Sequence, residues 1–195
     1  MTADHRDPLS RKDRQEQTRQ SLILAARSVF ARDGYHKANL AAIAQEAGFS
    51  KGAVYSNFPH KAALFLAVMD VNMLTSGHAD DCTSTAALTR TTVPDTAPPD
   101  AVRGFALATL EFIAVAARDH TLSHELAERQ VKLTEHYTVI AEAQRHEHDP
   151  LTAGELGSLM AALDQGIGFL TLANRDAVPQ ELQHVGMQRL LRSSV

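Results

Sequence analysis

The chain has 195 residues, of which 44% are hydrophobic and 22% are charged, a balance that excludes wholesale disorder and predicts a globular protein. The single cysteine argues against a disulfide framework, and the charged first residues argue against a signal peptide. No apolar run approaches the ~20 residues needed to span a membrane. We therefore expect a cytoplasmic protein. The net charge is −4, but it is uneven: residues 1–61 carry ten Lys or Arg and six Asp or Glu, whereas residues 62–195 carry nine and seventeen. This asymmetry suggests a phosphate-facing head on an acidic body.

The first 12 residues are polar and contain Pro8, so we expect a flexible arm over residues 1–12. Apolar residues then recur at helical spacing, which predicts a first helix over residues 13–33. Gly34 follows directly, and glycine is the residue that most often ends a helix in the left-handed conformation. The apolar positions of this helix are Leu22, Ile23, Ala26, Val29 and Phe30.

Two short helices follow, separated by a turn that contains glycine. Asn39 is a preferred N-cap residue, and the apolar stripe behind it stops at Gly48. Ser50 is a second N-cap candidate, and beyond it Val54 and Phe58 are one turn apart, so both can face one core. A short helix, a glycine turn and a second short helix form the pattern of a helix-turn-helix.

The rest of the chain predicts longer helices and no strand. Pro59 ends the third helix, and a fourth begins at Lys61. The composition of residues 75–100 shifts to Thr, Ser, Asp and Pro, so we expect a loop over its last ten residues. Further helices are predicted over residues 101–118, 121–147, 152–174 and 179–192. The predicted fold class is therefore all-α.

The segment from Asp33 to Phe65, DGYHKANLAAIAQEAGFSKGAVYSNFPHKAALF, resembles the DNA-binding domain of TetR-family regulators, and the likeness extends back to about Arg14. Its spacing is specific: Gly-Tyr after the first helix, Ile-Ala in the second, Gly-Phe-Ser-Lys-Gly at the turn, then Tyr-x-x-Phe and a lysine three residues later. The link Pro59-His60 and Ala62 depart from the family habit. The resemblance implies a helix-turn-helix domain over residues 13–60 and a helical ligand-binding and dimerisation domain over residues 61–195.

The third helix is the expected DNA-reading element. A helix N-terminus offers free N–H groups and the positive end of the helix dipole, both of which favour phosphate. Val54 and Phe58 should anchor this helix from behind and leave its polar edge for the groove, while the resemblance implies backbone contacts from Asn39 and Lys61. The predicted DNA-binding residues are Asn39, Ser50, Lys51, Gly52, Ala53, Tyr55, Ser56, Asn57 and Lys61, of which Tyr55 and Lys61 are the leading candidates.

Family members pair their last two long helices with those of a second subunit, so the resemblance implies a homodimer through residues 152–174 and 179–192. Four glycines lower the helix propensity of the first segment by ~1 kcal/mol each relative to alanine, and close helix packing would compensate. A two-fold dimer sets its recognition helices ~34–36 Å apart on a palindromic operator. The alternative is that these helices pack only within one chain.

A pocket for a small-molecule effector is expected among the carboxy-terminal helices. Large or polar side chains on these helices are its candidate lining, although an apolar residue on a helix is more often part of the core than a ligand contact. The candidates are Phe105, Phe112, His124, Tyr137, Met160 and Phe169.

Ten histidines raise the question of a metal site. His120 and His124 have i, i+4 spacing, and residues 146–148 read His-Glu-His, but no carboxylate or cysteine at a diagnostic spacing completes a ligand set. We favour ordinary surface or pocket histidines and predict no metal and no cofactor. The acidic neighbours of Cys82 would raise its thiol pKa, which argues against a redox sensor.

The sequence contains no phosphate loop, nucleophile elbow or His-Glu-x-x-His pattern, so we do not expect an enzyme. The prediction is a DNA-binding transcriptional regulator, a repressor that binds a palindromic operator as a homodimer and is released by a small molecule. An activator is the other possibility within this class. The alternative from another class is a helical small-molecule or metal-binding protein that does not bind DNA.

Overall fold

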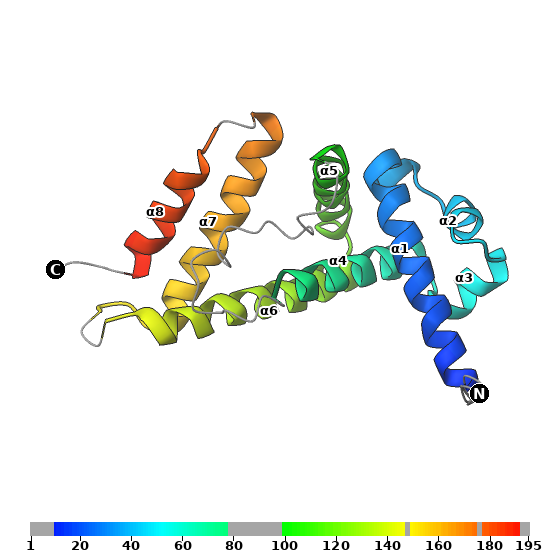
Figure 1. Cartoon of the computed structure of the whole chain (residues 1–195), viewed down its shortest axis with the longest axis horizontal. Helices are drawn as coiled ribbons and strands as arrows, with labels where there is room; N and C mark the ends of the chain where they lie inside the picture. Colours follow the sequence, from blue (N-terminus) through cyan, green and yellow to red (C-terminus); the bar gives the residue numbers. More distant parts are fainter. Residues whose placement is uncertain (1–9, 78–98, 147–148, 175–176, 192–195) are drawn as a thin grey trace, which may run out of the picture.

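The computed structural model describes residues 10–77, 99–146, 149–174 and 177–191, and within these ranges every regular element is an α-helix. Figure 1 shows an elongated molecule with α1–α3 at one end and α7 and α8 at the other, while α4, α5 and α6 lie between them. The predicted all-α class is confirmed. The helices are α1 (Arg11–Lys37), α2 (Leu40–Glu46), α3 (Lys51–Asn57), α4 (Lys61–Gly77), α5 (Pro99–Ala116), α6 (His120–Gln144), α7 (Ala153–Ala173) and α8 (Gln180–Leu191).

Helix α1 begins earlier than the sequence analysis expected, because a capping box fixes its first turn. The Asp13 N–H donates to Ser10 Oγ at 3.1 Å, and the Ser10 N–H donates to Asp13 Oδ2 at 3.0 Å. The expected arm of residues 1–12 therefore ends before Arg11, and its first nine residues lie outside the described ranges. Gly34 has a φ of 76°, the left-handed conformation expected of a helix end, and a short turn continues from it to Lys37.

The first hydrophobic core joins α1–α4 to α5. Its centre is a cluster of aromatic rings in which the Phe65 centroid lies 4.8 Å from those of both Phe30 and Phe112, and the Tyr35 centroid lies 5.1 Å from that of Phe112. Because Phe112 belongs to α5, the amino-terminal core does not end at residue 60. Residue 60 therefore does not separate two hydrophobic cores, because side chains of α4 and α5 pack in the same core as α1–α3.

The second core lies among α6, α7 and α8 and includes Tyr137, Leu156, Met160 and Met187, all buried. Gly157 allows α6 and α7 to approach closely, since a Cβ at this position would lie 2.7 Å from the backbone nitrogen of Thr138. The other three glycines of α7 have open space beside them within the described part of the chain. Close packing thus explains one of the four glycines inside a single subunit.

Helix α7 is more apolar than the sequence analysis expected. By length and composition it could cross a bilayer, although only 28% of its most apolar window is buried. It nevertheless carries Glu155 and Asp164, packs along α6 and contacts α8. Exposed large apolar side chains on α7 and α8 are Leu159, Phe169, Leu170, Leu182 and Val185, which are 46–59% exposed.

Candidate nucleic-acid interface and ligand cavity

Helices α2 and α3 form the predicted helix-turn-helix, and both begin at the predicted N-cap residues. The Asn39 side-chain oxygen accepts a hydrogen bond from the Ala42 N–H at 2.9 Å, and the Ser50 hydroxyl oxygen accepts one from the Ala53 N–H at 3.2 Å. Gly48 lies between the helices with a φ of 74°, a conformation that glycine adopts without strain. These two caps and one glycine fix the turn.

Helix α3 is held in place from behind. Val54 and Phe58 are buried in the first core. The Arg19 guanidinium of α1 lies 4.5 Å from the centre of the Phe58 ring and donates to the Asn57 carbonyl oxygen at 3.4 Å. The role of Arg19 cannot be recognised from the sequence, because only the fold brings this position of α1 next to the end of α3.

The opposite edge of α3 is open. Lys51, Gly52, Tyr55 and Ser56 are exposed, and the Tyr55 side chain keeps 57% of its surface. Ala53 is half-buried, and its carbonyl oxygen accepts hydrogen bonds from the Ser56 hydroxyl (3.0 Å) and the Asn57 amide (2.8 Å). Asn57 is therefore partly committed to the helix itself. The predicted residues of α3 lie on one short element, and four of them are exposed to solvent.

Lys61 has a different position from the one expected of a residue that contacts phosphate. Its Nζ donates to the carbonyl oxygens of Tyr35 (2.7 Å), His36 (3.1 Å) and Ala38 (3.0 Å) and lies 4.5 Å from the centre of the Tyr35 ring. An ammonium has three N–H donors, so all of them are used. Burial lowers the pKa of Lys61, partly offset by the nearby Glu111 carboxylate. This lysine ties the start of α4 to the turn after α1.

Two other contacts stabilise the amino-terminal helices α1–α4, which we call the head. The imidazole Nδ1 of His60 accepts a hydrogen bond from the Ala63 N–H at 3.1 Å, so the unusual Pro59-His60 link supplies the cap of α4. Glu111 of α5 accepts a hydrogen bond from the His36 N–H at 2.9 Å. Helix α5 thereby contacts the turn that leads into α2.

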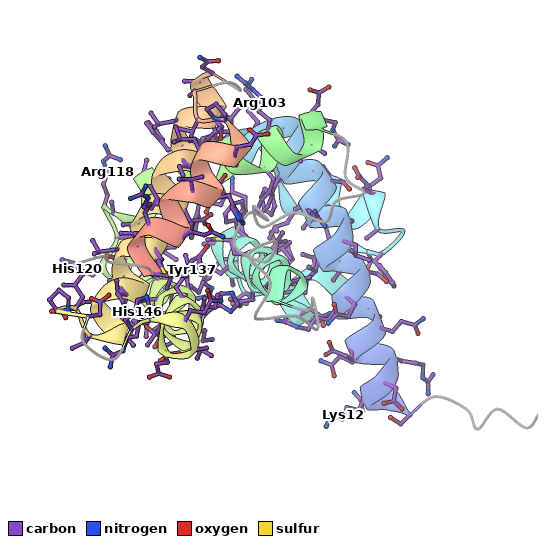
Figure 2. All side chains as sticks on the ribbon, turned by 60° about the vertical axis from the view of Figure 1, so that its left-hand side comes forward. Lys12, Arg103, Arg118, His120, Tyr137 and His146 are labelled. Atoms are coloured by element: carbon purple, nitrogen blue, oxygen red, sulfur yellow. The ribbon has the colours of Figure 1, made fainter. Side chains whose placement is uncertain are left out.

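Exposed basic side chains lie at the start of α1 and at the start of α3. In Figure 2, Lys12 lies at the start of α1, far from the helices α6–α8. Arg11, Arg14 and Lys51 are also exposed. Positive charge that is solvent-accessible on this part of the molecule favours a polyanionic partner.

A cavity of about 370 Å³ lies among α4, α5, α6 and α7. Of the six candidates from the sequence analysis, only Phe105 lines it. Its lining residues are Met69 from α4; Phe105, Thr109 and Ile113 from α5; Leu126, Arg129, Gln130, Leu133 and Thr134 from α6; and Ser158, Ala161, Ala162 and Gln165 from α7.

The other five candidates lie elsewhere, because the helices turn them away from the cavity. Phe112 packs in the aromatic cluster of the first core, and Met160 is fully buried in the second. Phe169 is 59% exposed. The His124 imidazole is exposed and lies 3.7 Å from the Glu128 carboxylate. Helical periodicity alone does not distinguish a face that lines a cavity from a face that fills a core.

Tyr137 is the fifth, and it faces α7. Its hydroxyl is hydrogen-bonded to the Asp164 carboxyl, and burial raises the pKa of both groups. The pKa of Asp164 reaches about 6, because desolvation outweighs the stabilising hydrogen bond from Tyr137. This pair joins α6 to α7 within the second core.

The histidines do not form a metal site in the described part of the chain, where no group of three His, Cys, Asp or Glu side chains is arranged to hold an ion. His120 begins α6 and His146 lies just beyond its end (Figure 2). Glu147, His148 and Cys82 lie outside the described residues.

Comparison with known proteins identifies the amino-terminal part. Residues 22–68 match the family model of bacterial regulatory proteins of the tetR family. Over 64 residues the chain is 42% identical to the HTH-type transcriptional activator FasR of Mycolicibacterium smegmatis, a match that covers 32% of this chain and 29% of FasR. The chain thus spans less than a third of the length of this curated relative.

Solved structures share the whole fold. A TetR-family transcriptional regulator from Cytophaga hutchinsonii superimposes with a TM-score of 0.69 at 20% identity, over 96% of this chain and 98% of that one. NalD of Pseudomonas aeruginosa, the secondary repressor of the MexAB-OprM multidrug efflux pump, superimposes with a TM-score of 0.56 at 18% identity, over 92% and 96%. The chain therefore contains a segment, residues 22–68, that matches the tetR family of bacterial regulatory proteins, and its described helices share the fold of solved TetR-family regulators.

Proposed function

We propose that the chain is a cytoplasmic transcriptional repressor that binds a palindromic operator as a homodimer and is released when a small molecule occupies the cavity. The observation that carries the DNA-binding part is the two-sided character of α3. Its Val54 and Phe58 side chains are buried, while Lys51, Gly52 and Tyr55 remain exposed at its amino-terminal end. This arrangement suits a helix that enters the major groove by its N-terminal residues.

Each exposed group has a distinct role in this proposal. The Lys51 ammonium and the N–H groups at the start of α3 bind phosphate, and Gly52 lets the backbone approach the duplex. Tyr55 and Ser56 reach phosphates or base edges, and the Ala53 methyl group can contact a thymine methyl group. Asn39 and Ser50 accept capping hydrogen bonds through oxygen, so the Asn39 amide and the Ser50 hydroxyl keep donors for phosphate.

Two of the residues predicted to contact DNA have a supporting role in this proposal instead. Lys61 would have to give up three carbonyl partners to bind a phosphate, and we assign it the role of positioning α3 and α4 relative to each other. Asn57, whose amide donates to the Ala53 carbonyl oxygen, stabilises the end of α3.

Dimerisation is supported by the exposed apolar side chains of α7 and α8. A group of exposed apolar side chains on two neighbouring helices is unfavourable in water and is typical of a protein interface. The glycines of α7 that have no close neighbour, such as Gly166, would allow the helices of a second subunit to approach. A two-fold axis there would present both copies of α3 to successive turns of one duplex.

Release of the operator requires only a modest coupling free energy between ligand binding and DNA binding. A coupling free energy of ~1–3 kcal/mol corresponds to roughly 5–150-fold in operator affinity. The cavity supports this part of the proposal, because its walls include α4 and α5, which also pack in the core of the DNA-binding head. Repression then needs no further contact, since a bound dimer occupies its operator. Activation is the second candidate, favoured by the likeness to the activator FasR.

The test is selection of bound sequences from a random duplex library, followed by a salt titration on the recovered site. We expect a palindrome and an affinity that falls steeply as salt rises. Tyr55→Ala should weaken binding, and the exposed Lys132→Ala of α6 should leave it unchanged. A helical small-molecule-binding protein of another class would recover no sequence and show no salt-dependent binding. Transcription in vitro from a promoter that carries the recovered site separates repression from activation.

A further inference from the structure

The lining of the cavity defines the chemistry of a ligand. Most of its walls are apolar, with Met69, Phe105, Ile113, Leu126 and Leu133 from three helices. Among the described lining residues, Arg129 is the only one with a charged side chain. The volume of about 370 Å³ lies at the lower end of the range of ~300–1,000 Å³ typical of small-molecule sites. A ligand that fits has a small apolar body and one anionic group.

Arg129 is held on two sides, but one of its donors is unused. Its Nη2 lies 2.8 Å from Asp70 Oδ2, and its Nη1 donates to the Glu125 carbonyl oxygen at 2.8 Å. The Nε N–H is buried and makes no hydrogen bond. Only 16% of the Arg129 side chain is exposed, so this donor has little access to water. A buried donor without a partner is unfavourable, and a carboxylate that reached both Nε and Nη2 would satisfy it.

We propose that the cavity binds apolar monocarboxylates, and that the ligand carboxylate replaces Asp70 on the Nε–Nη2 edge of Arg129. This inference rests on the proposed function, because it names the effector of the same regulator. The exchange favours the ligand because two parallel hydrogen bonds replace the single one to Asp70. Asp70 is 40% exposed and can return to water, whereas Arg129 cannot.

The exchange reaches the DNA-binding head through α4. Asp70 lies on α4, which begins at Lys61, directly after α3. The Asp70–Arg129 ion pair ties α4 to α6, and its loss removes that tie while the ligand fills the space beside Met69. The ligand therefore stabilises the conformation in which α4 is released from α6. A ligand shifts an equilibrium only by such a difference in affinity between two states.

The other explanation is that the Asp70–Arg129 pair is a structural tie and that the cavity selects ligands by shape alone. The two explanations differ in their dependence on charge. If shape alone matters, a carboxylic acid and its primary amide bind equally well. Replacing Arg129 or Asp70 then does not change the ratio of the two affinities.

The experiment measures binding of straight-chain carboxylates, from hexanoate to dodecanoate, and of 4-phenylbutyrate to the full chain by calorimetry in the absence of DNA. Each acid is compared with its primary amide and its amine. We expect at least one acid to bind about tenfold or more tightly than its amide, with no binding of the amine. Equal affinities of acids and amides across the series, or no binding of any acid, would overturn the proposal.

Variants of the pair test the exchange. Arg129→Gln should abolish the preference for acid over amide, whereas Asp70→Asn should increase the affinity for the acid, because the competing carboxylate is gone. Arg118→Gln, at an exposed arginine outside the cavity, is the matched control and should change nothing. Asp70→Asn that binds the acid no more tightly than the wild type would contradict the exchange, even if Arg129→Gln fails to fold.

Binding to the selected duplex is measured separately, so the two proposals can fail independently. If no duplex is recovered, the proposed function is wrong, while the calorimetry still decides the ligand chemistry. If the duplex binds, the acid should weaken that binding by at least about fivefold and its amide should not. A ligand that binds Arg129 and leaves duplex affinity unchanged would refute the release of α4.

Discussion

Two lysines ten positions apart in the chain, Lys51 and Lys61, illustrate how neighbouring groups decide the role of a side chain. Lys51 begins α3 and is exposed, whereas the Lys61 ammonium donates to three carbonyl oxygens at the turn after α1. From the sequence alone both are basic residues at a helix start. The hydrogen bonds predict that Lys51 contacts DNA and that Lys61 stabilises the fold.

Replacing these lysines with methionine, which keeps an unbranched stem, separates the two roles. Lys61→Met should lower the free energy of unfolding by about 1–3 kcal/mol, because partly buried carbonyl oxygens lose their donor. Lys51→Met should leave stability unchanged but reduce the salt dependence of duplex binding by about one phosphate contact. Denaturant unfolding and a salt titration measure the two effects. If Lys61→Met is as stable as the wild type and its duplex binding depends less on salt, Lys61 contacts DNA rather than stabilising the fold.

Asp164 is a carboxyl group whose burial makes stability depend on pH. Its pKa is about 6 in the folded chain, mainly through desolvation, against an ordinary value of 3.8. Between these values the unfolded chain loses the proton and the folded chain keeps it, so stability falls as pH rises from about 4 to 6 and is level above. Asp164→Asn keeps an acceptor for Tyr137 and cannot ionise.

We therefore expect Asp164→Asn to be more stable than the wild type at pH 8 by about 1–3 kcal/mol, and to lose most of this advantage at pH 4. Denaturant unfolding at pH 4, 5, 6 and 8 measures the difference directly. A difference that is constant over this range would mean that the Asp164 carboxyl titrates with an ordinary pKa.

At the scale of helices, one glycine sets the distance between α6 and α7. A Cβ at Gly157 would meet the backbone and hydroxyl of Thr138, whereas a Cβ at Gly154 would meet nothing within 4 Å. Both residues lie on α7, so intrinsic helix propensity favours alanine over glycine at each. Only the packing against α6 distinguishes them.

Gly157→Ala should destabilise the chain by about 1–3 kcal/mol, because backbone atoms must move apart. Gly154→Ala is the matched control and should be neutral or stabilising by up to about 1 kcal/mol. Thermal or denaturant unfolding gives both values. Equal effects at the two positions would show that the close approach of α6 and α7 is not maintained in solution.

At the scale of the whole molecule, the exposed apolar side chains of α7 and α8 form the candidate dimer interface. Phe169 and Leu182 are 59% and 58% exposed, and Leu24 on α1 is 61% exposed. A single exposed apolar residue such as Leu24 is ordinary, whereas a group of five on two adjacent helices is typical of an interface.

Phe169→Glu combined with Leu182→Glu should convert a dimer to a monomer in sedimentation velocity, because two charges cannot be buried at an apolar interface without partners. The control Leu24→Glu should leave the dimer intact. The double variant should also bind the palindrome more weakly, since one copy of α3 reaches only half a site. A wild-type chain that sediments as a monomer at all concentrations would contradict the homodimer.

The sequence by itself determined the all-α class, the positions of the helices and the caps at Asn39 and Ser50, because periodicity, capping and glycine conformation are local properties. It also determined which edge of α3 is exposed, since Val54 and Phe58 are one turn apart. Only the tertiary structure decided the cavity lining and the partners of Arg19, Lys61 and Arg129. These depend on contacts between residues far apart in the chain, where several helix faces with the same apolar pattern compete for core, cavity and interface.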